Sequence, residues 1–207
     1  MGAGKLLKKH KPERLPEKQA FAAIGQAELV KIYQKFFEEY NQVVAQVLLT
    51  RDVVTDKVKN RNAKSTLNTL IGMNIIPVIN ENDTVATDEI KHLGYGDNDR
   101  LSADVACLVK ADLLVILSDI DGLFSSDPKK DQSAKFINKV VEITPEIEKI
   151  AFGSNSKFAK GGMATKVAAA KVCIDHRINT VITNGEDPDV IFDILEGKDI
   201  GTLFVAP

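Results

Sequence analysis

The segment INENDTVAT (79–87) gathers side chains that donate and accept hydrogen bonds at the end of an apolar stretch, and the polar residues are Asn80, Glu81, Asn82 and Asp83. A small polar ligand could bind such a group. An Asx-rich turn that satisfies its own backbone is an equally good interpretation of the same residues.

The segment GYGDNDRLSAD (94–104) has two glycines followed by Asp97, Asn98 and Asp99, ahead of a predicted helix. We expect Asp99 to cap the N-terminus of that helix. The carboxylates of Asp97 and Asp99 would repel each other unless a cation lies between them, and the ammonium group of an amino-acid substrate is such a cation. A capped turn without a ligand remains an equal alternative.

The segment LLVILSDIDGLFSSDP (113–128) begins with the most apolar predicted strand of the chain. This strand would deliver Ser118 and Asp119 to the carboxyl edge of a sheet, where α/β proteins bind ligands. Because Asp119 follows an apolar run, we expect its carboxylate to lie where solvent is limited. The alternative is an ordinary turn at Asp121-Gly122.

The segment SKFAKGGMATK (156–166) has two glycines ahead of a predicted helix, with Lys166 in its first turn. The N-terminus of a helix offers backbone N–H groups to a phosphate. The spacing is not that of a Walker A motif, and a glycine pair alone is a weak signal. Together with the other segments, however, the lysine, the anion site and the nearby carboxylates fit phosphoryl transfer, which depends on positioning and charge neutralisation.

The elements that must position these residues alternate between helices and strands. Apolar periodicity predicts helices over 17–40, 57–73, 100–110, 145–151, 163–176 and 188–195. Apolar runs predict strands over 43–49, 75–80, 113–118, around 136–143, 179–183 and 201–205. This alternation predicts an α/β protein with a mainly parallel sheet that is covered on both faces. No repeat or linker indicates a second domain.

The composition excludes several classes of protein. The chain has 207 residues, 44% of them hydrophobic and 27% charged, and a formal net charge of −2. No broad basic field favours nucleic acid as a partner, and no apolar run approaches the roughly 20 residues that span a membrane. The two cysteines, Cys107 and Cys173, are expected to be buried and reduced, and the histidines have no zinc-ligand spacing.

The combination of INEND, GDNDRLSA, SDIDG followed by a DP turn, GGMATK and a terminal GTLF resembles the amino-acid kinase family. SDIDG with its DP turn is shared across that family, whereas GDNDRLSA after INEND is particular to its glutamate 5-kinase branch. The resemblance covers essentially the whole chain. It implies a three-layer α/β/α sandwich with an open, mainly parallel sheet, and phosphorylation of the glutamate side-chain carboxylate by ATP.

The resemblance also implies roles for single residues. Asp83 and Asn98 would bind glutamate, with Asp97 as a neighbouring contact. Ser118 and Asp119 would lie beside the nucleotide phosphates, Asp119 also holding the catalytic lysines. The roles assigned at the helix are catalysis for Lys166, organisation of the site for Asp99, and ATP binding for Lys160, Gly161, Gly162, Met163, Ala164, Thr165 and Lys166.

The chain departs from the family pattern at both ends. MGAGKLL resembles the residues that follow the family's second strand, so about 50–60 residues in two βα-sized pieces would be absent. They would carry a second catalytic lysine, and losing one such charge costs about 10²–10³ in rate. We therefore expect 1–207 to be a kinase domain without its first strands, without the RNA-binding-type PUA module, and weakly active or inactive.

The expected partners are ATP, Mg²⁺ carried by the nucleotide, and L-glutamate. The expected product is γ-glutamyl phosphate, in the first step of proline biosynthesis, with L-proline as a feedback inhibitor. MGAGKLLKKHK has no apolar segment of the kind found in secretory signals, so we expect a cytoplasmic protein. The resemblance implies a homo-oligomer, a dimer or a tetramer. Two alternatives remain: another family member acting on uridylate, acetylglutamate or aspartate, or a non-catalytic protein that binds ATP or an amino acid.

Overall fold

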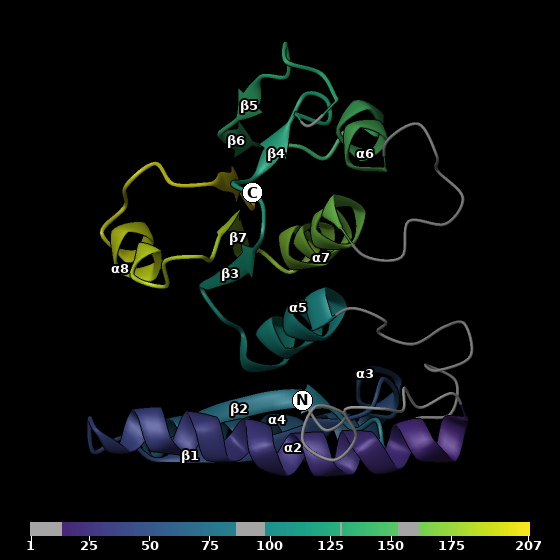
Figure 1. Ribbon diagram of the computed structural model, residues 1–207, viewed down its shortest axis with the longest axis vertical. Helices are drawn as coiled ribbons and strands as arrows, with labels where there is room; N and C mark the ends of the chain where they lie inside the picture. The colour runs from purple at the N-terminus through teal and green to yellow at the C-terminus, as the bar shows by residue number, and fades with distance from the viewer. Residues whose placement is uncertain (1–13, 86–97, 129, 153–161) are drawn as a thin grey trace, which may run out of the picture. The chain divides into compact units, whose positions relative to one another are not determined.

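The computed structural model describes residues 14–85, 98–128, 130–152 and 162–207 (Figure 1). The chain divides into two units, Met1–Asn98 and Asp99–Pro207. Each unit has its own strands and its own buried apolar residues, and each is described by itself.

The first unit is a strand–helix–strand arrangement with a long helix beside it. Its elements are α2 (Leu15–Glu38), β1 (Val44–Leu49), α3 (Asp52–Thr55), α4 (Lys57–Gly72) and β2 (Ile76–Glu81). The strands pair in parallel, with Leu49 opposite Glu81. Helix α2 contacts β1, and α4, the crossover, contacts β2. Leu67 of α4 is fully buried, and the crossover brings the carboxyl ends of both strands to one edge.

The second unit contains a four-stranded sheet and its helices. The helices are α5 (Asn98–Val109), α6 (Pro145–Phe152), α7 (Met163–Asp175) and α8 (Val190–Leu195). The strands are β3 (Leu113–Ser118), β4 (Leu123–Phe124), β5 (Phe136–Ile137), β6 (Lys139–Val140), β7 (Asn179–Asn184) and β8 (Thr202–Phe204). Their order is β3-β7-β8-β6, with β4 and β5 forming a separate hairpin.

The core of the second unit lies where α7 meets the sheet. Helix α7 contacts β7, and α8 lies on the other side of β3 and β7 in Figure 1. The small residues Ala169, Ala170 and Cys173 are fully buried on α7 together with Ile182 and Phe204 of the strands. Small side chains on the helix let it approach the strands closely, and each large apolar side chain buried there contributes about 1.5–3 kcal/mol.

The pairing of strands confirms the predicted α/β class with mainly parallel strands. The pairs β1–β2, β3–β7 and β6–β8 are parallel, whereas β7–β8 and β4–β5 are antiparallel. The predicted cap of α6 is also confirmed, because the Ile147 N–H donates to Thr144 Oγ1 at 3.4 Å. Helix α3 and strand β4 escaped prediction, since four and two residues are too few to show a period. The single-domain organisation stays a prediction.

Gly201 lies at a tight approach between β8 and β7. Its φ of +67° is in the left-handed region, and an added Cβ would lie 2.3 Å from the Ile182 carbonyl oxygen. We therefore predict that Gly201→Ala lowers the free energy of unfolding by about 2–4 kcal/mol, from left-handed strain and overlap with backbone. Equilibrium urea unfolding measures the change.

Gly72→Ala is the matched control for that experiment. Gly72 is the last residue of α4, and an added Cβ would meet nothing within 4 Å. Alanine favours a helix over glycine, so this variant should be neutral or slightly more stable than the wild type. Equal stability of Gly201→Ala and the wild type would contradict the account of the β7–β8 approach.

Candidate active site

A buried ion pair joins the first turns of two helices in the second unit. Lys166 Nζ, on α7, donates to Asp99 Oδ2, on α5, at 3.0 Å. The Lys166 and Asp99 side chains are only 11% and 9% exposed. Burying two charges costs free energy unless they are paired and hydrogen-bonded. The pair therefore fixes a lysine ammonium group where little water competes for it.

The N-terminus of α7 is shaped by a glycine. Gly162 is the N-cap residue at φ +85° and ψ −157°, a conformation that glycine adopts readily, and it makes no side-chain cap. The first N–H groups of a helix have no partner within the helix. The side chains of Met163 and Ala164 belong to the apolar interior, so their contribution to an anion site would come from backbone N–H groups.

Asp99 has a different place from the one predicted. It lies in the first turn of α5, which begins at Asn98, so the prediction that Asp99 caps the helix is wrong. Its Oδ2 instead accepts from two residues of α7, the Thr165 hydroxyl at 2.7 Å and Lys166 Nζ at 3.0 Å. The Asp99 carboxylate is therefore bound by residues far apart in sequence. As a helix cap it would instead have accepted from backbone N–H groups nearby.

The carboxyl edge of β3 and β7 carries the predicted nucleotide residues. Ser118 Oγ donates to Asp119 Oδ1 at 3.2 Å, and Asn184 Nδ2 donates to Asp121 Oδ1 at 2.9 Å. Asp119 is exposed, so the expectation that its carboxylate avoids solvent is wrong. Lys166 pairs with Asp99, and the expected lysine-holding role of Asp119 stays a prediction.

In the first unit, which ends at Asn98, two residues predicted to lie in polar binding segments are in contact. Asn98 Nδ2 donates to Asn80 Oδ1 at 3.1 Å, and Asn80 Oδ1 also accepts from the Glu81 N–H at 2.9 Å. A backbone turn is also present, because the Val85 N–H donates to the Asn82 carbonyl oxygen at 3.1 Å. The Thr84 hydroxyl donates to Asn82 Oδ1 at 2.5 Å, which is a bond between side chains and not an Asx-turn. Sequence reasoning considered Asn80 but missed its contact, since 18 positions separate it from Asn98.

Asp83 follows directly in this segment and is partly buried. The predicted site residues Asp97, Lys160 and Gly161 lie outside the described residues. Their roles stay predictions.

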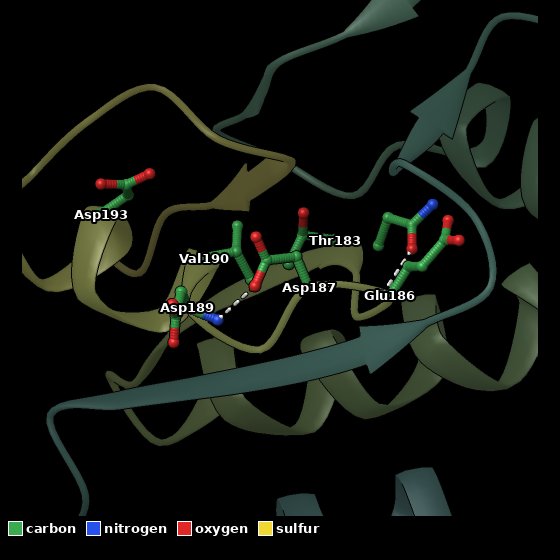
Figure 2. Close-up of a pocket in the computed structure, with 7 residues that line it drawn as sticks. Thr183, Glu186, Asp187, Asp189, Val190 and Asp193 are labelled. Atoms are coloured by element: carbon green, nitrogen blue, oxygen red, sulfur yellow. Dashed lines mark hydrogen bonds between the residues drawn. The ribbon is translucent and has the colours of Figure 1, made fainter.

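An acidic pocket of about 340 Å³ lies beside the end of β7 (Figure 2). Its lining comes from β7, the loop after it and α8: Thr183, Asn184, Glu186, Asp187, Asp189, Val190 and Asp193. Glu186 and Asp193 lie at opposite ends of the group in Figure 2. Four carboxylates repel a polyphosphate. This pocket is therefore poorly suited to a phosphate.

Neither cysteine is suited to nucleophilic catalysis. Both thiols are free, as predicted, and Cys173 is buried, whereas Cys107 is only partly buried, which differs from the prediction. Burial raises the pKa of the Cys107 thiol to about 11, and burial also raises the pKa of Cys173. Below its pKa a thiol is mostly protonated, and the protonated form is a poor nucleophile.

We predict that Cys107 reacts with iodoacetamide at pH 7.5 more than about 100-fold more slowly than an unperturbed cysteine, because its thiolate fraction is so much smaller. Mass spectrometry of the Cys107 peptide over time measures the rate. The rate should rise about tenfold between pH 7.5 and pH 8.5. Chain unfolded in urea is the control, and fast labelling of the folded chain would contradict the prediction.

Two features are absent from the described parts of the chain. In those parts, no group of three or more histidine, cysteine or acidic side chains is arranged to hold a metal ion. No helix there has the length and apolar character to cross a membrane.

Comparison with known sequences decides the family. Residues 3–184 match the sequence profile of the amino acid kinase family. The chain belongs to the amino acid kinase family. This confirms the resemblance that the motifs indicated, because the match includes INEND, GDNDRLSA, SDIDG and GGMATK.

Individual relatives agree with the narrower resemblance. The chain is 53% identical over all 207 residues to glutamate 5-kinase of Clostridium perfringens, covering 77% of that protein. It is 51% identical over its whole length to glutamate 5-kinase of Listeria monocytogenes, covering 75% of it. Over 206 residues it is 48% identical to glutamate 5-kinase of Enterococcus faecalis, covering 76% of it.

Solved structures confirm the predicted amino-acid kinase fold. E. coli aspartokinase III in complex with aspartate and ADP matches with a TM-score of 0.63 at 17% identity, over 93% of this chain and 41% of that one. An isopentenyl phosphate kinase substrate complex matches with a TM-score of 0.58 at 19% identity, over 98% of this chain and 77% of that one. At these identities the likeness extends to the fold alone.

Proposed function

We propose that this amino acid kinase transfers the γ-phosphoryl group of ATP to the side-chain carboxylate of L-glutamate. The products are γ-glutamyl phosphate and ADP, in the first step of proline biosynthesis. The observation that carries the proposal is the buried Lys166–Asp99 pair beside the uncapped start of α7. Relatives named glutamate 5-kinase, about half identical to the chain, support the choice of substrate.

The reaction needs charge neutralisation rather than a covalent catalyst. A glutamate carboxylate oxygen attacks the γ-phosphorus, and the bond to the β,γ-bridging oxygen breaks, with its electron pair leaving on ADP. Negative charge lies on the phosphoryl oxygens throughout the transfer. Lys166 would stabilise that charge, with the first N–H groups of α7 binding further phosphate oxygens. Asp99 would organise the site by holding Lys166.

Glutamate recognition is proposed for Asp83, Asp97 and Asn98, all within the first unit. The carboxylates of Asp83 and Asp97 suit the substrate's ammonium group, and the Asn98 amide suits a substrate carboxylate. The contact between Asn98 and Asn80 supports this role, because it orients the amide. Ser118 and Asp119 are proposed for the nucleotide side, since they end a strand at a carboxyl edge.

The remaining ATP contacts are proposed for the segment Lys160–Lys166, by resemblance. Mg²⁺ would arrive on the nucleotide, because Mg²⁺ binds substrate phosphates and keeps several waters. Ser118 and Asp119 could accept hydrogen bonds from water molecules bound to such an ion. Two residues are too few to supply all of its ligands. We also propose a cytoplasmic homo-oligomer inhibited by L-proline, supported by the resemblance to glutamate 5-kinases.

An assay with hydroxylamine tests this proposal. The purified chain is incubated with ATP, Mg²⁺ and glutamate, and the acyl phosphate is trapped as γ-glutamyl hydroxamate while ADP is measured. We expect glutamate-dependent hydroxamate at the low rate anticipated from the sequence, and at least about tenfold less ADP formation with aspartate, acetylglutamate or uridylate as acceptor. Lys166→Met should lower the rate by about 10²–10³, because one charge-stabilising donor is lost.

Lys171→Met is the matched control, since Lys171 lies on the same helix but is exposed and pairs with Glu148. Its rate should stay within about twofold of the wild type, as expected for an exposed pair. Calorimetry with a non-hydrolysable ATP analogue and glutamate separates binding from catalysis. Binding of both without turnover, or preference for another acceptor, would contradict the proposed function.

A further inference from the structure

The hydroxyl of Thr165 lies between two oxygen acceptors. Thr165 Oγ1 is 2.7 Å from Asp99 Oδ2 and 2.9 Å from the carbonyl oxygen of Gly162. A bond from a threonine hydroxyl back to the preceding turn is common in helices and carries no functional meaning by itself. The contact with Asp99 is the unusual one, because it reaches a carboxylate 66 positions away in the sequence.

The single proton of the Thr165 hydroxyl can be donated to only one of the two acceptors. A hydroxyl has a single proton, and a carboxylate paired with an ammonium group can only accept. Whichever acceptor the proton points at, the hydroxyl oxygen faces the other acceptor without a proton. That repulsion is larger against the charged carboxylate at 2.7 Å than against the neutral carbonyl at 2.9 Å. The hydroxyl therefore donates to Asp99, and 2.7 Å is the length of a charge-assisted bond.

The same carboxylate oxygen serves both residues of α7. Asp99 Oδ2 accepts from Thr165 and from Lys166. If Lys166 turns toward a phosphoryl group, its bond to Asp99 weakens, and Asp99, which is only 8% exposed, has little water to replace it. An unmade hydrogen bond at a buried charge is costly. The second donor would lower that cost at the moment when the lysine is needed elsewhere.

We propose that Thr165 is a positioning residue whose hydroxyl holds Asp99 in place while Lys166 acts on the transferring phosphoryl group. This inference rests on the proposed function as a glutamate-phosphorylating kinase. It gives the Thr165 side chain a task distinct from that of the backbone N–H groups around it. It also predicts an effect on turnover rather than on substrate binding, because neither substrate touches the hydroxyl in this role.

The experiment compares Thr165→Val, which keeps the branched shape, with Thr165→Ser, which keeps the hydroxyl. We expect kcat of Thr165→Val to fall about 10- to 100-fold, the loss of one charge-assisted bond, with KM for ATP and glutamate within about threefold. Thr165→Ser should retain kcat within about threefold. If Thr165→Val does not fold, Thr165→Ala replaces it with the same expectations.

Thr69→Val is the matched control. The Thr69 hydroxyl makes the same kind of backbone bond within α4, to the Ser65 carbonyl at 2.8 Å. This variant should keep the kcat of the wild type. A wild-type kcat in Thr165→Val, a loss that serine does not rescue, or a loss confined to KM would overturn the positioning role.

A double-mutant cycle tests whether Thr165 acts through Asp99. Adding Thr165→Val to Asp99→Asn should change kcat by less than about twofold, whereas a multiplied loss would overturn the inference. The proposed function fails separately, if the wild type forms no γ-glutamyl hydroxamate. In that case the same variants are compared by ATP hydrolysis without acceptor, where equal rates for all of them would overturn the role of Thr165.

Discussion

The buried pair of Lys166 and Asp99 is the interaction on which the site depends. Two charges removed from water need a close partner and further hydrogen bonds, and breaking such a pair from one side typically costs about 3–5 kcal/mol. Here the pair joins the first turn of α5 to the first turn of α7, across 67 positions of sequence. A hydrophobic contact would serve stability as well, so the charge pair is better explained by the chemistry of an ammonium group held in a dry place.

The surrounding fold supplies the conditions for that pair. The small residues Ala169, Ala170 and Cys173 let α7 pack tightly on the sheet, which fixes the direction of its N-terminus. Gly162 then starts the helix without a side-chain cap, and the first N–H groups of a helix, which have no partner within it, suit an anion. The positive charge of Lys166 and the positive end of the α7 dipole therefore lie close together. The acidic pocket beside α8 has the opposite charge and is unsuited to phosphate.

Much of the fold could be predicted from the sequence, because it follows from local patterns. The helix Leu15–Glu38 and the strand Leu113–Ser118 have clear apolar periods or runs, and the motifs identified the family. The site was harder to predict, for a physical reason. From the sequence, Asp99 could either cap α5 or pair with a distant lysine. Only the packing of the folded chain decides between these two roles. The solvent exposure of Asp119 likewise depends on the chain around it rather than on the apolar residues that precede it. The contacts of Thr165 and Asn80 are of the same long-range kind.

A crystal structure with a non-hydrolysable ATP analogue, Mg²⁺ and glutamate tests the central claim most directly. The account predicts a γ-phosphate oxygen about 3 Å from Lys166 Nζ, with the other phosphate oxygens on the first N–H groups of α7 and Asp99 still bonded to the Thr165 hydroxyl. Phosphates bound away from α7, with Lys166 fully engaged by Asp99, would contradict it.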